Sequence, residues 1–175
     1  MTDALETGLT DTFEQIGEDI SNRPVPGYFQ SRNTDTTTNI NSPGLALIPI
    51  VGDIDETSPD FTPFGDGARV IVNVAALIEV SWNISYTSND PRISVETSCT
   101  HNLDALNPRG RGGYVRDVGG HNRATSQGSR LVTVAAGDNI GIASQADANA
   151  GNAFLLSTDM DGGDANMIIK ILERL

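Results

Sequence analysis

The sequence predicts an all-β protein built as a sandwich of two antiparallel sheets. The clearest observation is residues 70–86, where Ile78, Val80, Trp82, Ile84 and Tyr86 alternate with polar side chains. A period of two in β-branched and aromatic residues is typical of a strand with one buried face. Glycine is frequent, at 18 residues, and Thr, Ser, Asn and Asp fill the gaps between short apolar runs. This mixture favours many short strands joined by turns.

The acidic character of the chain argues against several classes of partner. The formal net charge is −12 over 175 residues. A negative field of this size repels nucleic acids and anionic membranes, so we expect neither as a partner. No apolar run approaches a membrane span, and no signal peptide or lipidation motif is present. We therefore expect a protein that is made in a cytosol and stays there, or leaves by lysis or as part of a particle.

Residues 1–26 are predicted to form an arm separate from the sandwich. Their apolar residues are spaced four, four, three and four apart, which places them on one face of a helix: Leu5, Leu9, Phe13, Ile16 and Ile20. Pro24 and Pro26 end this helix. Alone in water it would be marginal, so its apolar stripe needs a partner, either other subunits or a host surface. A frayed tail is the alternative interpretation.

Three segments precede the central stretch. Residues 27–41 begin with Tyr28 and Phe29, become polar and Thr-rich, and are predicted to be an edge strand or an extended arm. Residues 44–51 predict a short strand at an edge or bulge, because Pro49 cannot donate to a ladder. Residues 52–67 carry five acids and are interpreted as a loop, with Phe61 and Phe64 holding it to the body.

The second half of the chain alternates short strands and turns. Residues 92–101, 114–118, 129–135, 139–145 and 153–157 are predicted strands, separated by turns at 88–91, 107–113, 136–139 and 159–164 and by polar loops at 119–128 and 145–152. Cys99 falls on the apolar face of its strand and is interpreted as a small core residue. As the only cysteine, it excludes an intrachain disulfide, so core burial, metal or subunit contacts must stabilise the fold.

The final segment, residues 167–172, gives the best local argument for an oligomer. A helix also fits, but the paired isoleucines and the preceding Gly-Gly turn favour a strand. As a strand it places Met167, Ile169 and Ile171 on one side and Ile168 and Leu172 on the other. A strand that is apolar on both faces must be covered on both. In a two-layer sandwich the second cover has to be another subunit.

Eight to ten short strands with a long loop in mid-chain indicate a jelly roll. Three segments follow one another in a characteristic order: the strand Ala76–Tyr86, the block Ser129–Ser144 with its Gly137-Asp138 turn, and the apolar C-terminal strand. Over residues 28–175 this order resembles the trimeric jelly rolls of the tumour-necrosis-factor and complement globular-head type. The chain departs from that family at Ala76, where Gly is frequent, and at Ile78, where Tyr is frequent. Its cysteine-poor character without a signal peptide is similar to phage versions of the fold, used as head decoration (cement), head-fibre and spike proteins.

This resemblance implies a homotrimer on the outer surface of a phage capsid, with residues 27–175 as the knob and residues 1–26 as an arm that docks on the major capsid protein. The predicted trimer-interface residues are Ile168, Lys170, Leu172, Arg109 and Arg111. For the arginines, pairing with acids across subunits is favoured over a ligand patch. The alternative function is a receptor-binding spike or fibre tip that recognises a host glycan or protein through residues 107–130 or 145–152.

No catalytic apparatus is predicted, and therefore no enzyme. His101 and His121 lack the spacing of a metal site or a base with its orienting partner, and no phosphate-binding loop or nucleophile motif occurs. No cofactor is expected. Asp159, Asp161 and Asp164 are weak candidates for calcium, with a plain acidic turn as the preferred interpretation.

Overall fold

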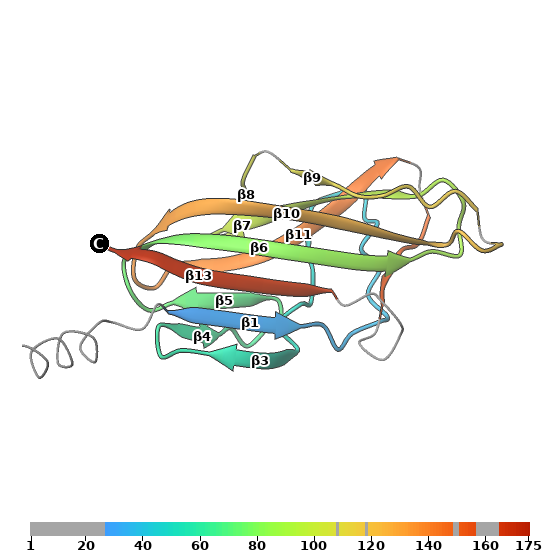
Figure 1. The fold of residues 1–175 in the computed structure, drawn as a ribbon. Coiled ribbons are helices and arrows are strands. Elements are labelled where there is room, and N and C mark those ends of the chain that lie inside the picture. Colours follow the sequence, from blue (N-terminus) through green and yellow to red (C-terminus); the bar gives the residue numbers. More distant parts are fainter. Residues whose placement is uncertain (1–26, 108, 118, 149–150, 157–164) are drawn as a thin grey trace, which may run out of the picture.

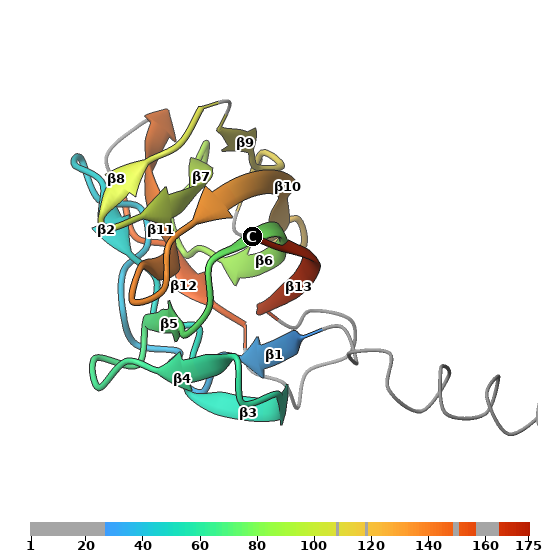
Figure 2. The same cartoon turned by 90° about the vertical axis from the view of Figure 1, so that its left-hand side faces the viewer.

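The computed structural model describes residues 27–107, 109–117, 119–148, 151–156 and 165–175, and these residues form two antiparallel sheets (Figure 1). Within them there is no helix, and hence none long and apolar enough to cross a membrane. The predicted helical arm, residues 1–26, lies outside the described residues. Figure 2 shows the two sheets from the end, as two layers with the core between them.

The six-stranded sheet runs in the order β10 (Arg123–Val134), β6 (Ala76–Thr87), β13 (Asn166–Arg174), β1 (Tyr28–Arg32) and β3 (Asp53–Thr57), with β12 (Phe154–Leu155) also pairing with β6. The seven-stranded sheet runs β4 (Phe61–Pro63), β5 (Arg69–Val72), β11 (Asn139–Ala148), β7 (Ser94–His101) and β8 (Asp104–Ala105). Two short strands extend it, β2 (Ala46–Leu47) on β11 and β9 (Gly110–Arg111) on β7.

Strands that are distant in sequence are neighbours in both sheets. The last strand, β13, lies between β6 and β1, and β11 lies between β5 and β7. The connections from β5 to β6, from β6 to β7 and from β10 to β11 each pass from one sheet to the other. This arrangement is the two-sheet antiparallel jelly roll, so the predicted fold class is confirmed.

The central prediction, alternation along residues 78–86, is confirmed by β6. Ile78, Val80, Ile84 and Tyr86 are fully buried and Trp82 nearly so, while Glu79, Ser81 and Asn83 between them are partly exposed. The stretch 70–86 is nevertheless not one strand. It breaks at residues 73–75, so that β5 and β6 belong to different sheets.

Asn73 stabilises this break. Its side-chain Nδ2 donates to the Pro59 carbonyl at 2.9 Å and to Thr62 Oγ1 at 3.0 Å. These bonds tie the corner between the sheets to the segment around β4. An Asn whose side chain bonds nearby polar groups competes with the strand ladder, which is why such residues favour turns.

A chain of buried hydrogen bonds joins the two sheets beneath β6. Trp82 Nε1 donates to Thr97 Oγ1 of β7 at 2.7 Å, and Thr97 Oγ1 lies 2.7 Å from Ser126 Oγ of β10. Nearby, Tyr86 Oη donates to the Gly113 carbonyl at 2.6 Å. Burial raises the pKa of Tyr86 to about 12, so this hydroxyl stays a donor. The core is therefore held by directional bonds as well as by apolar area.

Several predicted boundaries in the first half of the chain are wrong. The acidic segment 52–67 is not a loop, because it contains β3 and β4, and β1 is internal to its sheet rather than an edge strand. The strand expected over 44–51 shrinks to Ala46–Leu47. Phe61 is buried as predicted, whereas Phe64 is 38% exposed and carries the Arg69 guanidinium 3.9 Å from its ring centre.

In the second half, the polar segment 119–128 is also not a loop, because β10 begins at Arg123. The strand expected over 114–118 reduces to a single bridge between Val115 and Ile93. The tight turn after β10 is confirmed: Gly137 has φ +94°, and Asp138 N donates to the Ala135 carbonyl. A positive φ at the third residue of a turn is what favours Gly there.

Candidate functional site

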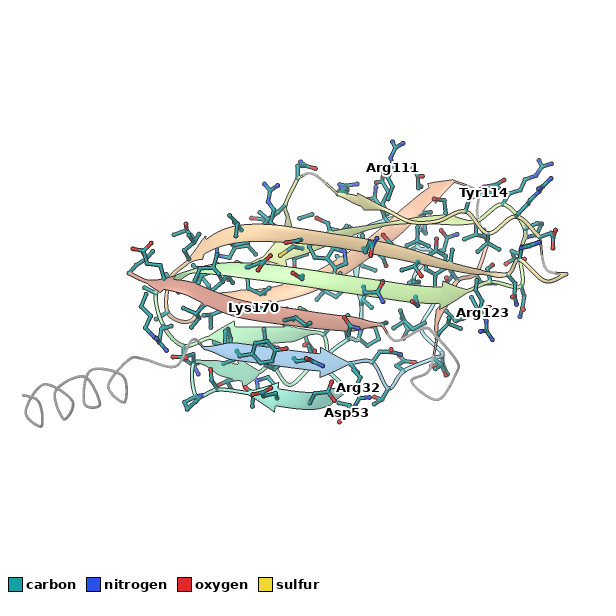
Figure 3. All side chains as sticks on the ribbon, viewed as in Figure 1. Arg32, Asp53, Arg111, Tyr114, Arg123 and Lys170 are labelled. Atoms are coloured by element: carbon teal, nitrogen blue, oxygen red, sulfur yellow. The ribbon has the colours of Figure 1, made fainter. Side chains whose placement is uncertain are left out.

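The outer face of the six-stranded sheet, defined by the outward residues of β10, β6, β13 and β1, is the first candidate surface. The strand register places Ile168 between Ser81 of β6 and Gln30 of β1. One row along, Lys170 lies between Glu79 and Tyr28. Ile168 is half-buried and Lys170 exposed, and Lys170 is seen on the near face of β13 in Figure 3.

The central part of this face is poor in charge. Among the outward residues of β6 and those of β13 up to Lys170, the charged side chains are Glu79 and Lys170, which are directly opposite each other. Their neighbours are uncharged, namely Leu77, Ser81, Asn83, Asn166, Ile168, Gln127, Ser129 and Leu131. On a chain with a net charge of −12, a broad and nearly neutral sheet face is the unusual part of the surface.

The final strand follows the predicted alternation as far as Ile171. Met167 and Ile169 are fully buried and Ile171 nearly so, as expected for the inward side. A β-bulge between Ile171 and Glu173 then interrupts the register with β6. Leu172 is the bulged residue and is 52% exposed. A bulge inserts one unpaired residue and re-aims the side chains around it, so the strand's simple two-faced pattern ends there.

The structure does not bring Arg109 and Arg111 onto that face. They lie at β9, beside β7 in the other sheet, and both pair with Glu96 of their own chain. Arg109 Nη1 is 3.3 Å from Glu96 Oε2, and Arg111 Nε is 3.8 Å from Glu96 Oε1. The Arg111 side chain is still 78% exposed, and Figure 3 shows it at the margin above β10. The predicted interface residues therefore fall on two separate surfaces.

The second candidate surface is a groove at the end of the molecule opposite the C-terminus, which we call the distal groove. It has a volume of about 550 Å³ and is lined by Tyr114, Arg116, Gly120, His121, Asn122 and Arg123. Figure 3 shows Tyr114 and Arg123 at this end. The cluster of arginines is visible in the sequence, whereas the concave site that loop and strand form together is not.

Both walls of the distal groove are anchored to the sandwich. Val115 is fully buried, its N donates to the Ile93 carbonyl at 2.8 Å, and its carbonyl accepts from Arg92 N at 2.7 Å. On the other wall, the Asn122 carbonyl accepts from Ser88 N at 2.9 Å and from Thr87 Oγ1 at 3.1 Å. Because Val115 points inward, its neighbours Tyr114 and Arg116 are held outward at the groove.

Two residues weighed for chemistry have structural roles instead. Cys99 is buried, and burial raises the pKa of its thiol to about 12, so it is not a nucleophile near neutral pH. His101 Nε2 lies 2.7 Å from Asp138 Oδ2, and Asn102 Nδ2 donates to the other oxygen of Asp138 at 2.8 Å. These bonds fasten the β10–β11 turn to the end of β7.

Other predicted sites lie outside the described residues. These are the docking residues Leu5, Leu9, Phe13, Ile16 and Ile20 and the calcium candidates Asp159, Asp161 and Asp164. Within the part of the chain that the structure describes, no three His, Cys, Asp or Glu side chains gather as a metal site would require. No model of a known protein family matches the chain, and no curated protein is similar to it in sequence.

Comparison with solved structures confirms the fold type. The globular domain of a zebrafish complement 1qA protein is similar over 86% of this chain and 100% of its own, with a TM-score of 0.57 and 10% identity. Murine APRIL covers 84% of this chain and 100% of its own at a TM-score of 0.56 and 10% identity. The tumour necrosis factor Eiger of S. frugiperda is similar over 87% of this chain and 96% of its own, with a TM-score of 0.52 and 14% identity. The chain therefore has the jelly-roll fold of the tumour-necrosis-factor and complement-head type.

Proposed function

We propose that the chain is a homotrimeric structural protein, a decoration (cement) or head-fibre protein that binds the outer surface of a phage capsid and stabilises it. The observation that carries the trimer is the nearly neutral outer face of β6 and β13, centred on Ile168. Interfaces are depleted of charge at their core. On so acidic a chain, a strongly acidic surface would repel a second copy.

The geometry of a ring supports this assignment. A cyclic trimer uses a heterologous contact, in which one patch of each subunit meets a different patch of the next. The outer face around Ile168 and Lys170 supplies one patch, and the β9–β10 margin that carries Arg109 and Arg111 supplies the other. In the proposed ring, the two surfaces that carry the predicted interface residues would meet each other across each subunit boundary.

The capsid role rests on the polarity of the molecule. The Gly27 carbonyl accepts from Ile171 N at 2.8 Å, so the chain enters β1 at the end where β13 finishes, opposite the distal groove (Figure 1). An arm that docks through Leu5, Leu9, Phe13, Ile16 and Ile20 would then hold that end against the major capsid protein. Three arms on one trimer multiply a weak contact by avidity.

The test is reconstitution with capsids that lack the protein. We expect the full chain to measure as a trimer by light scattering and to sediment with capsids. A chain without residues 1–20 is expected to remain a trimer but to stay in the supernatant. A matched pair keeps the arm's length: Leu9→Ser with Phe13→Ser removes apolar contacts, and Asp11→Ser is the control. Full occupancy by the truncated chain would refute the docking role, and a monomer at micromolar concentration would refute the trimer.

A receptor-binding spike or fibre tip is the second candidate, and the distal groove is the observation that favours it. The two candidates differ in location. Antibody labelling over the whole head supports decoration, whereas labelling confined to a tail or vertex spike supports receptor binding. In neither candidate is the protein an enzyme. The buried Cys99 and the structural pairing of His101 support that part of the proposal.

A further inference from the structure

We propose that the distal groove is a binding site for an anionic saccharide, a sugar polymer that carries carboxylate or phosphate groups. The first argument is a local reversal of charge. Residues 107–130 contain five of the ten arginines of the chain and a single acid, Asp117, in a protein of net charge −12. Two of these arginines, Arg116 and Arg123, line the groove together with His121.

Two cationic side chains of the groove, Arg116 and His121, differ from the arginines nearby in their pairing. Arg109 and Arg111 share Glu96. Within the described chain, neither Arg116 nor His121 has an ion-pair or hydrogen-bond partner, and both side chains are exposed. An Arg guanidinium presents a planar fork that matches a carboxylate or phosphate with two parallel hydrogen bonds. The groove therefore offers donor groups to an outside anion.

The remaining lining residues favour a sugar over a simple ion. The Tyr114 side chain is 54% exposed at the groove although large apolar residues are otherwise mostly buried. An exposed aromatic ring gives an apolar surface with a polar tip, and the Asn122 amide gives both a donor and an acceptor for hydroxyl groups. A volume of about 550 Å³ is in the usual range of small-ligand sites.

The acidic remainder of the surface limits how such a polymer approaches. A polyanion is repelled by acidic parts of the surface such as the exposed strand β3 and is attracted by the cations of the distal groove, so approach to the distal end is favoured. A nucleic acid is the competing occupant, because it is also a polyanion. It is disfavoured because non-specific strand binding uses several stacking aromatics along a basic track, and the groove has one, Tyr114.

The experiment is a titration of the isotope-labelled full chain, followed by amide chemical shifts and calorimetry. The probes are an oligogalacturonate, its neutral methyl ester, a phosphodiester-linked sugar oligomer, inorganic phosphate, and a single-stranded oligonucleotide of equal charge. We expect one or both acidic sugars to shift the groove residues, and the ester and free phosphate to bind at least tenfold more weakly. Which acidic sugar binds tighter identifies carboxylate or phosphate as the preferred group.

Variants separate a specific site from general charge. Arg116→Gln is expected to lower the affinity for the acidic sugar about tenfold, and Tyr114→Leu to lower it while leaving the weak phosphate binding unchanged. The matched control is Arg174→Gln, an arginine at the opposite end of the molecule whose side chain is 37% exposed, and this variant should bind as the native chain does. Melting curves confirm that each variant is folded.

The saccharide assignment is overturned if neither acidic sugar binds or if the neutral ester binds equally well. It is also overturned if Arg174→Gln loses as much affinity as Arg116→Gln, or if the oligonucleotide binds the groove more tightly than either sugar. The capsid assay does not involve the groove, and the titration does not involve capsids. Failure of one proposal is therefore distinguishable from failure of the other.

Discussion

Trp82 occupies the space that a side chain at position 128 would need. Gly128 lies opposite Trp82 in the ladder between β10 and β6, and a methyl group built on Gly128 would overlap the Cζ2, Cη2 and Cε2 atoms of the indole. The only tryptophan of the chain therefore fits the core because its cross-strand neighbour has no side chain.

Gly128→Ala is expected to destabilise the protein by about 1–3 kcal/mol, since an overfilled core forces side chains off their rotamers or shifts the backbone. Chemical denaturation followed by the fluorescence of Trp82 measures this change. Gly44→Ala is the matched control, because a methyl group there would meet no atom within 4 Å. Equal stability of the two variants would contradict the packing described.

Thr97→Val is expected to cost about 1–3 kcal/mol although it keeps the side-chain shape. It removes the acceptor of Trp82 Nε1 and leaves that buried N–H unsatisfied, while Ser126 Oγ loses one partner and keeps its bond to the Gly110 carbonyl. Thr133→Val, on an exposed position of β10, should change the free energy of unfolding by less than about 0.5 kcal/mol. A double-mutant cycle with Trp82→Phe should show that the two losses are not additive.

Asp138 gives a pH dependence of known sign. Hydrogen bonds from Asn102, from His101 and from the Ala135 N–H lower its pKa from 3.8 to about 2. A depressed carboxyl pKa stabilises the fold above the unfolded value and loses that contribution as the pH falls toward the folded value. We expect the free energy of unfolding to decrease between about pH 4 and pH 2. Asp138→Asn should be less stable at neutral pH and show a shallower decrease than the control Asp117→Asn.

Leu103→Gly is expected to stabilise the protein. Asn102 and Leu103 form the two-residue turn between β7 and β8 with φ values of 50° and 75°, a left-handed pair for which Asn-Gly is the favoured sequence. Leu103 is 55% exposed, so little burial is lost. A gain of about 0.5–1 kcal/mol in thermal or chemical denaturation is expected. Leu131→Gly, an equally exposed residue within β10, should instead destabilise.

Ile168→Asp tests the proposed trimer seam. A carboxylate at the centre of the outer face should leave each subunit folded, because Ile168 points away from the core, but should convert the trimer to a monomer in light scattering. Leu45→Asp places the same change beside β2 of the other sheet and should leave the trimer intact. A trimeric Ile168→Asp variant would move the interface elsewhere.

The sequence predicts the fold class because apolar and polar residues alternate along β6 and along β13 as far as Ile171, and such alternation indicates a strand with one buried face. The prediction of a loop over residues 119–128 is wrong from Arg123 onward, because the start of β10 lacks large apolar residues. The inward positions at the start of β10 are Ala124, Ser126 and Gly128, because the large rings of Tyr86 and Trp82 fill the core from β6. A strand whose inward residues must be small carries no apolar signal of its own.

The acidic strand β3 was missed for the opposite reason. All five of its residues are exposed, and it pairs only with β1 at the edge of the sheet. It is held to β1 by backbone bonds and by polar side-chain contacts of Asp53 and Asp55 with Arg32 and Gln30, and not by apolar burial. Charges on an edge strand deter pairing with other chains. Of the candidate sites, the outer face followed from the pattern of β13. The distal groove did not, since it depends on how the loop around Val115 folds against the start of β10.

The position of β13 sets an order on synthesis and folding. Its neighbours in the sheet, β6 and β1, leave the ribosome long before residues 166–174 exist, and β13 is the strand that joins them. Until then each has an unpaired edge, and unpaired edges recruit other chains. Folding of the six-stranded sheet must therefore wait for the last strand, and a nascent chain that stalls before residue 166 is expected to aggregate instead of forming a smaller stable domain.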